Sequence, residues 1–571
     1  MVAARWVEPE APPTRQTEER KGGQDVTSPQ HFYERTEAWI DRLMELNPGA
    51  ATQLGDHRFD GRLGDFTLAA QDAQNEEIKG MVAELAEMNT DDWPNDARVD
   101  HSLMTQIIKS FVRGHERLRG HIRNPGQYID ATTGSVMVLI IKEFAPLPER
   151  LKSALERTRQ VPRVLEEAKK VLIPSEVPRV WAETAIEQGQ MAPMLFTALL
   201  PGLAQGAAPD LVDELTEVGA AAGKAVEDYI AFVRDEVLPK AQADFAVGRE
   251  LFDEILREDH MVDYDADELI ETGWEQLRLT KQEMEAVAKE IDPSKTVEEI
   301  LEEAKADHPT AEGLLQAYED AMNGAKQFVI DHDIVTIPEG ESLKIIETPV
   351  YLRPIIPYAA YMSPGIFDEK QDGIFVVTPV DPNASEEEKE SKLKGHFNVK
   401  LPVVALHEAY PGHHLQLVRA NLTETLPRRM GSFLATLFIE GWAFYCEELM
   451  EQLGWISKPI QRLGRLHDQL WRAARIILDV SLHTRGMTVQ EAIDFMVEKV
   501  QLEPANATAE VRRYTQTPGQ PQSYLMGKLQ ILDLVEDFKK ANPDASLREV
   551  HDKMLAAGSL PPRLMRQALG L

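Results

Sequence analysis

The sequence predicts a mainly α fold, a large helical chain with a small β-sheet beside its central segment. Apolar residues recur at helical spacing, for example on the stripe formed by Phe32, Trp39, Leu43 and Leu46. Similar stripes occur in LKSALERTRQVPRVLEEAKKVL, DELTEVGAAAGKAVEDYIAFVRDEVL and DELIETGWEQLRLTKQEMEAVAKEI. No fixed self-similarity of about 20 to 50 residues is visible, so a solenoid of identical units is not supported.

Composition indicates an ordinary globular protein, with 43% hydrophobic and 27% charged residues in 571. A net charge of -34 would repel phosphate backbones and anionic lipids, so we expect neither nucleic-acid nor membrane partners. The single cysteine, Cys446, cannot form an internal disulfide. No apolar run approaches the roughly 18 residues of a membrane span, and the first residues do not resemble a signal peptide. These features predict a cytoplasmic protein, and the oligomeric state stays open.

Two units of very different length are expected. Residues 1–29 are polar, contain several prolines and lack periodicity, which is typical of a disordered tail. Residues 30–571 should form a single large helical domain, with a helical N-terminal half at 30–340 and a metal-site half at 341–571. The expected sheet lies in this second half, where LKIIETPVYLRPIIP and DGIFVVTPVDP are rich in β-branched and aromatic residues.

The most informative segment is residues 401–445, LPVVALHEAYPGHHLQLVRANLTETLPRRMGSFLATLFIEGWAFY. Pro402 suits the first turn of a helix that carries His407 and Glu408. Adjacent His and Glu begin the HExxH pattern of zinc peptidases, in which a second His follows four residues after the first and the Glu acts on water. Here that position is Pro411, which cannot bind a metal.

The next histidines are His413 and His414, six and seven residues after His407. Neither could share an ion with His407 on an unbroken helix. Pro411 removes a helical hydrogen bond and Gly412 adds backbone freedom, so the chain can bulge and bring a later histidine into place. We predict His413 as the second ligand, with His414 as the alternative.

A third ligand is expected from a second helix. FLATLFIEGWAFYCEEL is apolar nearly all round, which is typical of a buried helix, and Glu440 lies near its middle. His407, His413 and Glu440 would bind one Zn²⁺ and leave a position for water, as in catalytic zinc sites. Glu447 could hold a ligand histidine or be a surface residue near the helix end.

The segments HEAYPGHHLQ and IEGWAFYCEEL resemble the signature of the bacterial proteins grouped as domain of unknown function 885. Further similar segments are NPGAATQLGDHRFDGRLGDFT, NPGQYID, PVYLRPIIPYAAYMSPG, ILDVSLHTRGMTVQEAIDFM and RRYTQTPGQPQSYLMGKLQIL. The resemblance covers nearly the whole ordered chain and implies a helical metallopeptidase-like protein. It is specific for membership but not for a substrate. The two-helix zinc arrangement is also distantly similar to helical gluzincin peptidases such as thimet oligopeptidase and angiotensin-converting enzyme.

Two of the closing segments contain further candidate residues. Asp479 and His483 lie four residues apart, so the carboxylate could orient an imidazole that donates to substrate, or the two could be a surface pair. Tyr524 could stabilise an oxyanion; taken alone it would more often be a core aromatic, and the resemblance favours the site.

Three residues in the same closing segment are predicted to bind substrate. Arg513 could clamp a substrate carboxylate, Tyr514 flanks the same turn, and Gln520 is a weaker candidate for a hydrogen bond.

The predicted function is zinc-dependent hydrolysis of amide or peptide bonds, acting on short peptides through metal-activated water. In this mechanism Glu408 takes the proton from water and returns it to the leaving amine. Two other interpretations remain open: a metal-dependent hydrolase of non-peptide amides or esters, and a non-catalytic helical scaffold or binding protein.

Overall fold

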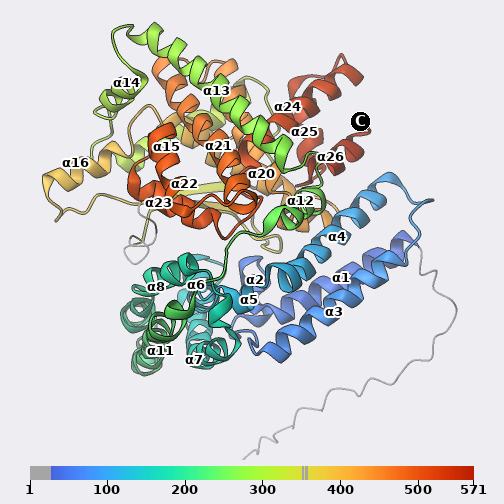
Figure 1. Cartoon of the computed structure of the whole chain (residues 1–571), viewed down its shortest axis with the longest axis vertical. Coiled ribbons are helices and arrows are strands. Elements are labelled where there is room, and N and C mark those ends of the chain that lie inside the picture. The colour runs from blue at the N-terminus through green and yellow to red at the C-terminus, as the bar shows by residue number, and fades with distance from the viewer. Residues whose placement is uncertain (1–27, 350–352, 354–355, 357) are drawn as a thin grey trace, which may run out of the picture.

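The computed structural model describes residues 28–349, 353, 356 and 358–571 (Figure 1). It confirms a mainly α architecture with one small sheet. Residues 1–27 of the predicted tail lie outside the described residues. The first helix, α1, begins at Pro29, where the Ser28 hydroxyl accepts a hydrogen bond from the backbone N–H of His31.

The chain begins with four helices, of which α1, α3 and α4 pack together on the right of Figure 1 and α4 contacts the C-terminal helix α26. They are α1 (Pro29–Leu46), α2 (Pro48–Gln53), α3 (Leu68–Ala86) and α4 (Asn95–Arg113). In α1 the predicted stripe faces the core: Phe32, Trp39 and Leu43 are buried, and Leu46 is half-buried.

A second group of helices surrounds its own apolar core, at the lower left of Figure 1. The group comprises α5 (Gly120–Arg123), α6 (Gly126–Ile141), α7 (Leu147–Val171), α8 (Arg179–Gly189), α9 (Ala192–Met194), α10 (Leu200–Ala207) and α11 (Val212–Phe232). The long helices α7 and α11 correspond to two of the predicted stripes, and α7 continues through Pro162.

The chain then crosses to the upper part of the molecule (Figure 1). There it forms α12 (Gly248–Glu258), α13 (Ala266–Ile291), α14 (Val297–Ala304) and α15 (Leu314–Asp331). The third predicted stripe forms α13, which begins with a capping box between Asp265 and Glu268 and packs along α21.

The sheet has three strands in the order β1-β3-β2. The strands are β1 (Ser342–Glu347), β2 (Ala359–Met362) and β3 (Asp372–Val377). β1 and β3 are parallel and come from the two predicted segments, whereas β2 is antiparallel to β3 and was not predicted. The pattern of β2, AAYM, is too short and too rich in alanine to stand out from the loop around it.

The remaining helices form the half of the chain predicted to hold the metal. They are α16 (Glu386–Lys394), α17 (Leu401–Glu408), α18 (His413–Asn421), α19 (Leu426–Arg429), α20 (Thr436–Gln452), α21 (Pro459–Thr484), α22 (Val489–Phe495), α23 (Pro504–Tyr514), α24 (Ser523–Ala541), α25 (Leu547–Ala556) and α26 (Pro562–Leu569). α20, α21 and α24 lie at the centre of this half (Figure 1).

α20 and α24 cross at two glycines. A Cβ built on Gly441 would lie 2.4 Å from the carbonyl carbon of Gly527, and one on Gly527 would lie 2.0 Å from the carbonyl oxygen of Leu437. Both distances are far inside van der Waals contact, so the two backbones touch directly. This close approach fixes α24 against the helix that carries Glu440.

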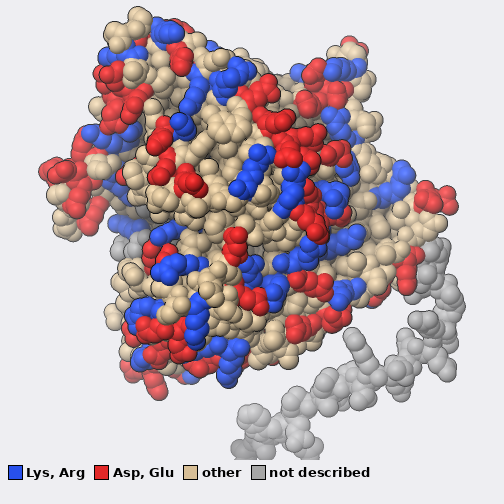
Figure 2. Space-filling view, viewed as in Figure 1, with Lys and Arg blue, Asp and Glu red and all other residues tan. Residues whose placement is uncertain are grey.

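Acidic side chains are spread over the surface, and Figure 2 shows them gathered on the projecting α16 at the left. The first turn of α16 carries Glu386, Glu387 and Glu388, all exposed, as expected for a solvated acidic run. None of the helices in the described part of the chain is both long and apolar enough to cross a membrane.

We predict that Gly527→Ala lowers the free energy of unfolding by about 1–3 kcal/mol, because the added methyl group would overlap the backbone of α20. Thermal melting followed by circular dichroism would measure it. Gly80→Ala in α3 is the matched control, since a Cβ there meets nothing within 4 Å and should stabilise the helix slightly. Equal melting temperatures for the two variants would contradict the close-approach argument.

Candidate metal centre

The turn between α17 and α18 brings the two predicted histidine ligands together. α17 starts with Pro402 in its first turn and ends at Glu408, and α18 begins at His413. A Cβ on Gly412 would lie 1.9 Å from the carbonyl oxygen of His407, so no larger residue fits this turn without a shift of the backbone. The turn at Gly412 therefore interrupts the helix between Glu408 and His413. Because of this interruption, the imidazole of His413 can lie 4.7 Å from that of His407.

Three side chains from three helices converge at this turn. One ligand atom from each of His407, His413 and Glu440 lies within 4.8 Å of the other two. Nε2 of His413 lies 3.4 Å from Oε2 of Glu440, and the two imidazole rings are 4.7 Å apart and nearly perpendicular. Ligand atoms of a tetrahedral zinc site are roughly 3.4 Å apart, so small side-chain adjustments would complete the geometry. The set is the one predicted from the sequence.

Glu447 fixes the orientation of His407. Its Oε1 accepts a hydrogen bond of 2.8 Å from Nδ1 of His407, and its side chain is 2% exposed. The surface alternative for Glu447 is therefore wrong. Because Nδ1–H points at the carboxylate, Nε2 is the nitrogen of His407 that remains for a metal.

The electrostatics of the cluster suit a cation. Burial acts to raise the pKa of Glu440, but the hydrogen bond and charge of His413 outweigh it and hold the pKa at about 2. Burial acts to lower the pKa of His413, but Glu440 raises it above its ordinary value. Nδ1 of His413 and Oε2 of Glu447 are buried without a hydrogen-bond partner in the described part of the chain. Two imidazoles beside an ionised carboxylate fit a divalent metal such as zinc.

His414, the alternative ligand, is part of a different network. Its Nε2–H donates to Glu341 at 2.7 Å, and its Nδ1 accepts from the hydroxyl of Tyr361 at 3.0 Å. Lys326 and Tyr410 also donate to Glu341. His414 is fully buried and both of its ring nitrogens have partners, so it does not join the cluster.

Glu408, the predicted base, lies half-buried at the end of α17, next to His407. Its charge contributes to the raised pKa values of His413, Tyr318 and Tyr361, which places its carboxylate close to all three.

Tyr524 reaches the cluster from α24. Its hydroxyl is close enough to Glu440 to help lower the pKa of that carboxyl. Burial and the charge of Glu440 in turn raise the pKa of Tyr524. The structure therefore places the predicted tyrosine beside the candidate metal ligands.

The predicted substrate-binding residues lie on the far side of Tyr524. Arg513 donates to Gln520 at 2.8 Å and to Glu510 at 3.0 Å. Tyr514 is fully buried, and its hydroxyl donates to Glu510 at 2.7 Å. Tyr514 therefore supports the position of Glu510 and does not face a substrate. Arg513 and Gln520, in contrast, are partly exposed.

His483 does not have the role predicted for it. Its side chain is fully buried, and Nε2–H donates to the backbone oxygen of Tyr514 at 2.9 Å. Asp479 accepts instead from the backbone N–H of Gly519. Burial lowers the pKa of His483 to about 4. The two residues hold the turn before α24, because a four-residue spacing allows but does not require a side-chain pair.

The sequence did not reveal the arginines of α21. Arg472 and Arg475 lie over the ring of Tyr524, with their guanidinium carbons 5.4 Å and 4.5 Å from its centroid. The signal that could have found them is WRAARIIL, where two cations three residues apart interrupt an otherwise apolar helix. Glu341 and Tyr361 were also missed, because they precede the cluster by about fifty residues or more in the chain.

A second group with metal-binding side chains lies at the surface. Asp72, His115 and His121 have ligand atoms within 4.8 Å of one another, and the two imidazole rings are stacked 4.1 Å apart. The Asp72 side chain is 57% exposed. This group is therefore more open to solvent than the one formed by His407, His413 and Glu440.

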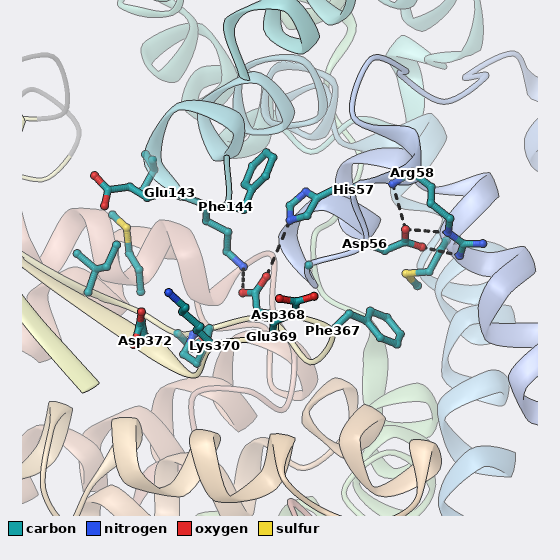
Figure 3. A pocket seen from close by; sticks show the side chains of 18 of the residues that line it. Asp56, His57, Arg58, Glu143, Phe144, Phe367, Asp368, Glu369, Lys370 and Asp372 are labelled. Carbon is teal, nitrogen blue, oxygen red and sulfur yellow. Dashed lines mark hydrogen bonds and ion pairs between the residues drawn. The ribbon is translucent and has the colours of Figure 1, made fainter. Parts of the chain in front are cut away.

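A cavity of about 980 Å³ lies elsewhere, between the first helices and the loop that precedes β3 (Figure 3). At its centre Asp368 accepts from Lys142 at 3.3 Å and faces His57. Ile374 of β3 lines this cavity, whereas its neighbour Gly373 touches His414. The cavity is therefore on the opposite face of the sheet, and none of the predicted site residues lines it.

Comparisons with other proteins support the resemblance seen in the sequence. The model of a family described as "Bacterial protein of unknown function (DUF885)" matches residues 48–569. A solved "putative lipoprotein of unknown function" from Shewanella oneidensis is similar, with 26% identity, a TM-score of 0.77 and coverage of 95% of this chain and 99% of that one. A "putative lipoprotein" from Colwellia psychrerythraea has the same fold, with 18% identity, a TM-score of 0.80 and the same coverage. No curated protein matches.

The two similar structures contradict the cytoplasmic location predicted from the sequence. Both similar structures are described as lipoproteins, which conflicts with the cytoplasmic location inferred from the sequence. That inference relied on the composition of the first residues and on the single cysteine, and neither observation tests where such a fold functions. The prediction of a cytoplasmic protein was wrong.

We predict that Glu447→Gln weakens zinc binding about tenfold or more, because the neutral amide polarises His407 less than the carboxylate does. Calorimetric titration of the metal-free protein with zinc would measure the affinity. Glu424→Gln, at an exposed position, is the control and should bind zinc like the parent protein. Unchanged zinc affinity in Glu447→Gln would show that this hydrogen bond does not support a metal site.

Proposed function

Because the chain belongs to the DUF885 family of bacterial proteins, a family described without a function, we propose from the geometry of the cluster that it is a zinc-dependent hydrolase of amide bonds. The proposed substrates are short peptides. One observation carries the proposal: His407, His413 and Glu440 converge from three helices beside Glu408.

The side chains present match the requirements of a catalytic site. His407, His413 and Glu440 would hold the metal, and three protein ligands leave a coordination position open. A structural zinc site would instead use four protein ligands. The bound zinc would supply a Lewis acid that makes water a stronger nucleophile at neutral pH.

Glu408 is proposed to handle the proton. We infer that its carboxylate accepts the proton that water loses as the new carbon–oxygen bond forms at the amide carbonyl. Glu408 then gives the proton to the amine nitrogen as the carbon–nitrogen bond breaks. Its position next to His407 on α17 fixes it at the edge of the cluster.

Tyr524 is proposed to stabilise the carbonyl oxygen. Its hydroxyl is protonated at neutral pH, and burial raises its pKa further, so it can donate a hydrogen bond to the negative charge that develops there. The contact between α20 and α24 at Gly441 holds this tyrosine beside Glu440.

The same chemistry would hydrolyse an ester or a non-peptide amide. A substrate panel containing peptides, simple esters and acylated amines separates these classes, and the fastest class identifies the reaction. The cation-rich surroundings of Tyr524 favour peptides that carry a negative group.

Glu408→Gln is expected to keep zinc and lose at least about a hundredfold in turnover of the best peptide, because the amide cannot accept the proton. Mass spectrometry of mixed peptides would measure cleavage, and elemental analysis would measure bound zinc. Glu386→Gln on the exposed face of α16 is the control and should retain full activity. A chelator should abolish activity in the parent protein, and added zinc should restore it. Retained turnover in Glu408→Gln would remove this residue from the mechanism.

A further inference from the structure

We propose that Arg472, Arg475 and Arg513, here called the arginine cluster, bind a carboxylate of the substrate. The proposal rests on the amide hydrolysis proposed above and names its substrate class: peptides with an anionic group close to the bond that is cleaved.

The arginine cluster lies against the candidate metal centre. Arg472 and Arg475 project from α21 over the ring of Tyr524, whose hydroxyl is beside Glu440. The charge of Arg513 also acts on Tyr524. A single tyrosine thus separates the guanidinium groups of Arg472 and Arg475 from a metal ligand, and a substrate held at the metal would extend towards them.

One of the two nearby carboxylates is shared by two cations. Asp468 lies 2.7 Å from Nζ of Lys400 and 3.6 Å from Nη1 of Arg472. Burial acts to raise the pKa of Asp468, but these two cations and His467 hold it at about 2. Asp468 is therefore ionised and can neutralise only one of its two cationic neighbours.

The second carboxylate is shared in the same way. Oε2 of Glu510 accepts from Arg475 at 2.8 Å and from Arg513 at 3.0 Å. Burial acts to raise the pKa of Glu510, but the two arginines hold it at about 2. Four cations thus share these two carboxylates, in a protein whose net charge is -34.

The hydrogen-bond donors of the cluster are not all used. Nη1 of Arg475 and Nε of Arg472 are buried without an acceptor in the described part of the chain. The Arg475 side chain is only 5% exposed, so water does not compensate for this donor. A buried N–H group of a guanidinium that has no acceptor is costly, and a carboxylate is the acceptor that a guanidinium binds best.

Arg513 provides the accessible part of the cluster. Its side chain is 38% exposed, and Glu510 on the same helix and Gln520 in the following turn hold it in place. A substrate carboxylate could therefore contact Arg513 first and draw on the charge of the two deeper arginines.

The test is calorimetric binding of two acetylated trialanines, one with a free carboxylate and one amidated, to zinc-loaded Glu408→Gln protein. This variant keeps both sites but should not consume the peptides. We expect the free acid to bind at least about tenfold more tightly, the usual range for a charge-assisted hydrogen bond. An amidated peptide ending in glutamate distinguishes a side-chain carboxylate from a terminal one.

Arg513→Gln, made in the same background, should remove the preference for the free acid and leave binding of the amidated peptide unchanged. Arg513→Lys should restore part of the preference. Arg512→Gln is the matched control, because Arg512 is the adjacent residue and pairs with Glu187. Equal melting temperatures of the variants would show that the fold is intact.

Equal binding of the free acid and the amide, or no binding of either, would overturn the carboxylate subsite. This result is separate from the proposed hydrolysis, which fails if the parent protein cleaves no peptide. Preference for the free acid that survives Arg513→Gln would also contradict the assignment.

Discussion

The interior of the C-terminal half of the molecule, residues 341–571, depends on the pairing of buried imidazoles with buried carboxylates from neighbouring helices. His407 bonds Glu447, and His413 lies against Glu440, with both acids on α20 and both histidines on the α17–α18 turn. An isolated carboxylate in an apolar helix would be protonated or exposed, because burial disfavours its charge. Each acid instead has an imidazole partner, and this pairing sets both the position of α20 and the donor set available to a cation.

The candidate site has two adjacent regions of opposite charge. Around the cluster, two histidines are surrounded by three acids, Glu408, Glu440 and Glu447, which suits a metal. Beyond Tyr524 the charge is reversed, because the carboxylates of Asp468 and Glu510 are each shared by two cations. A substrate with one end at the metal and a negatively charged end at the arginines would complement the charge of both regions.

Much of this could be predicted from the sequence, because the signals were local. The helical stripes, Pro402 at the start of α17, and the apolar surroundings of Glu440 lie within short windows, and so do His407 and His413. Other features depend on contacts between distant segments. The strand β2 exists because it pairs with β3, and His414 is held by Glu341, seventy-three residues away. Asp479 and His483 had the right spacing but different partners, since burial and the turn before α24 decided their hydrogen bonds.

The crossing of α20 and α24 has a consequence for how such a protein could change over time. Backbone meets backbone at Gly441 and Gly527, and this contact fixes the distance between the helices that carry Glu440 and Tyr524. Residues such as Arg513 and Gln520 could be exchanged for others without disturbing that spacing. Proteins descended from one ancestor with this fold could thus come to prefer different substrates while they keep the same arrangement of Tyr524 and Glu440.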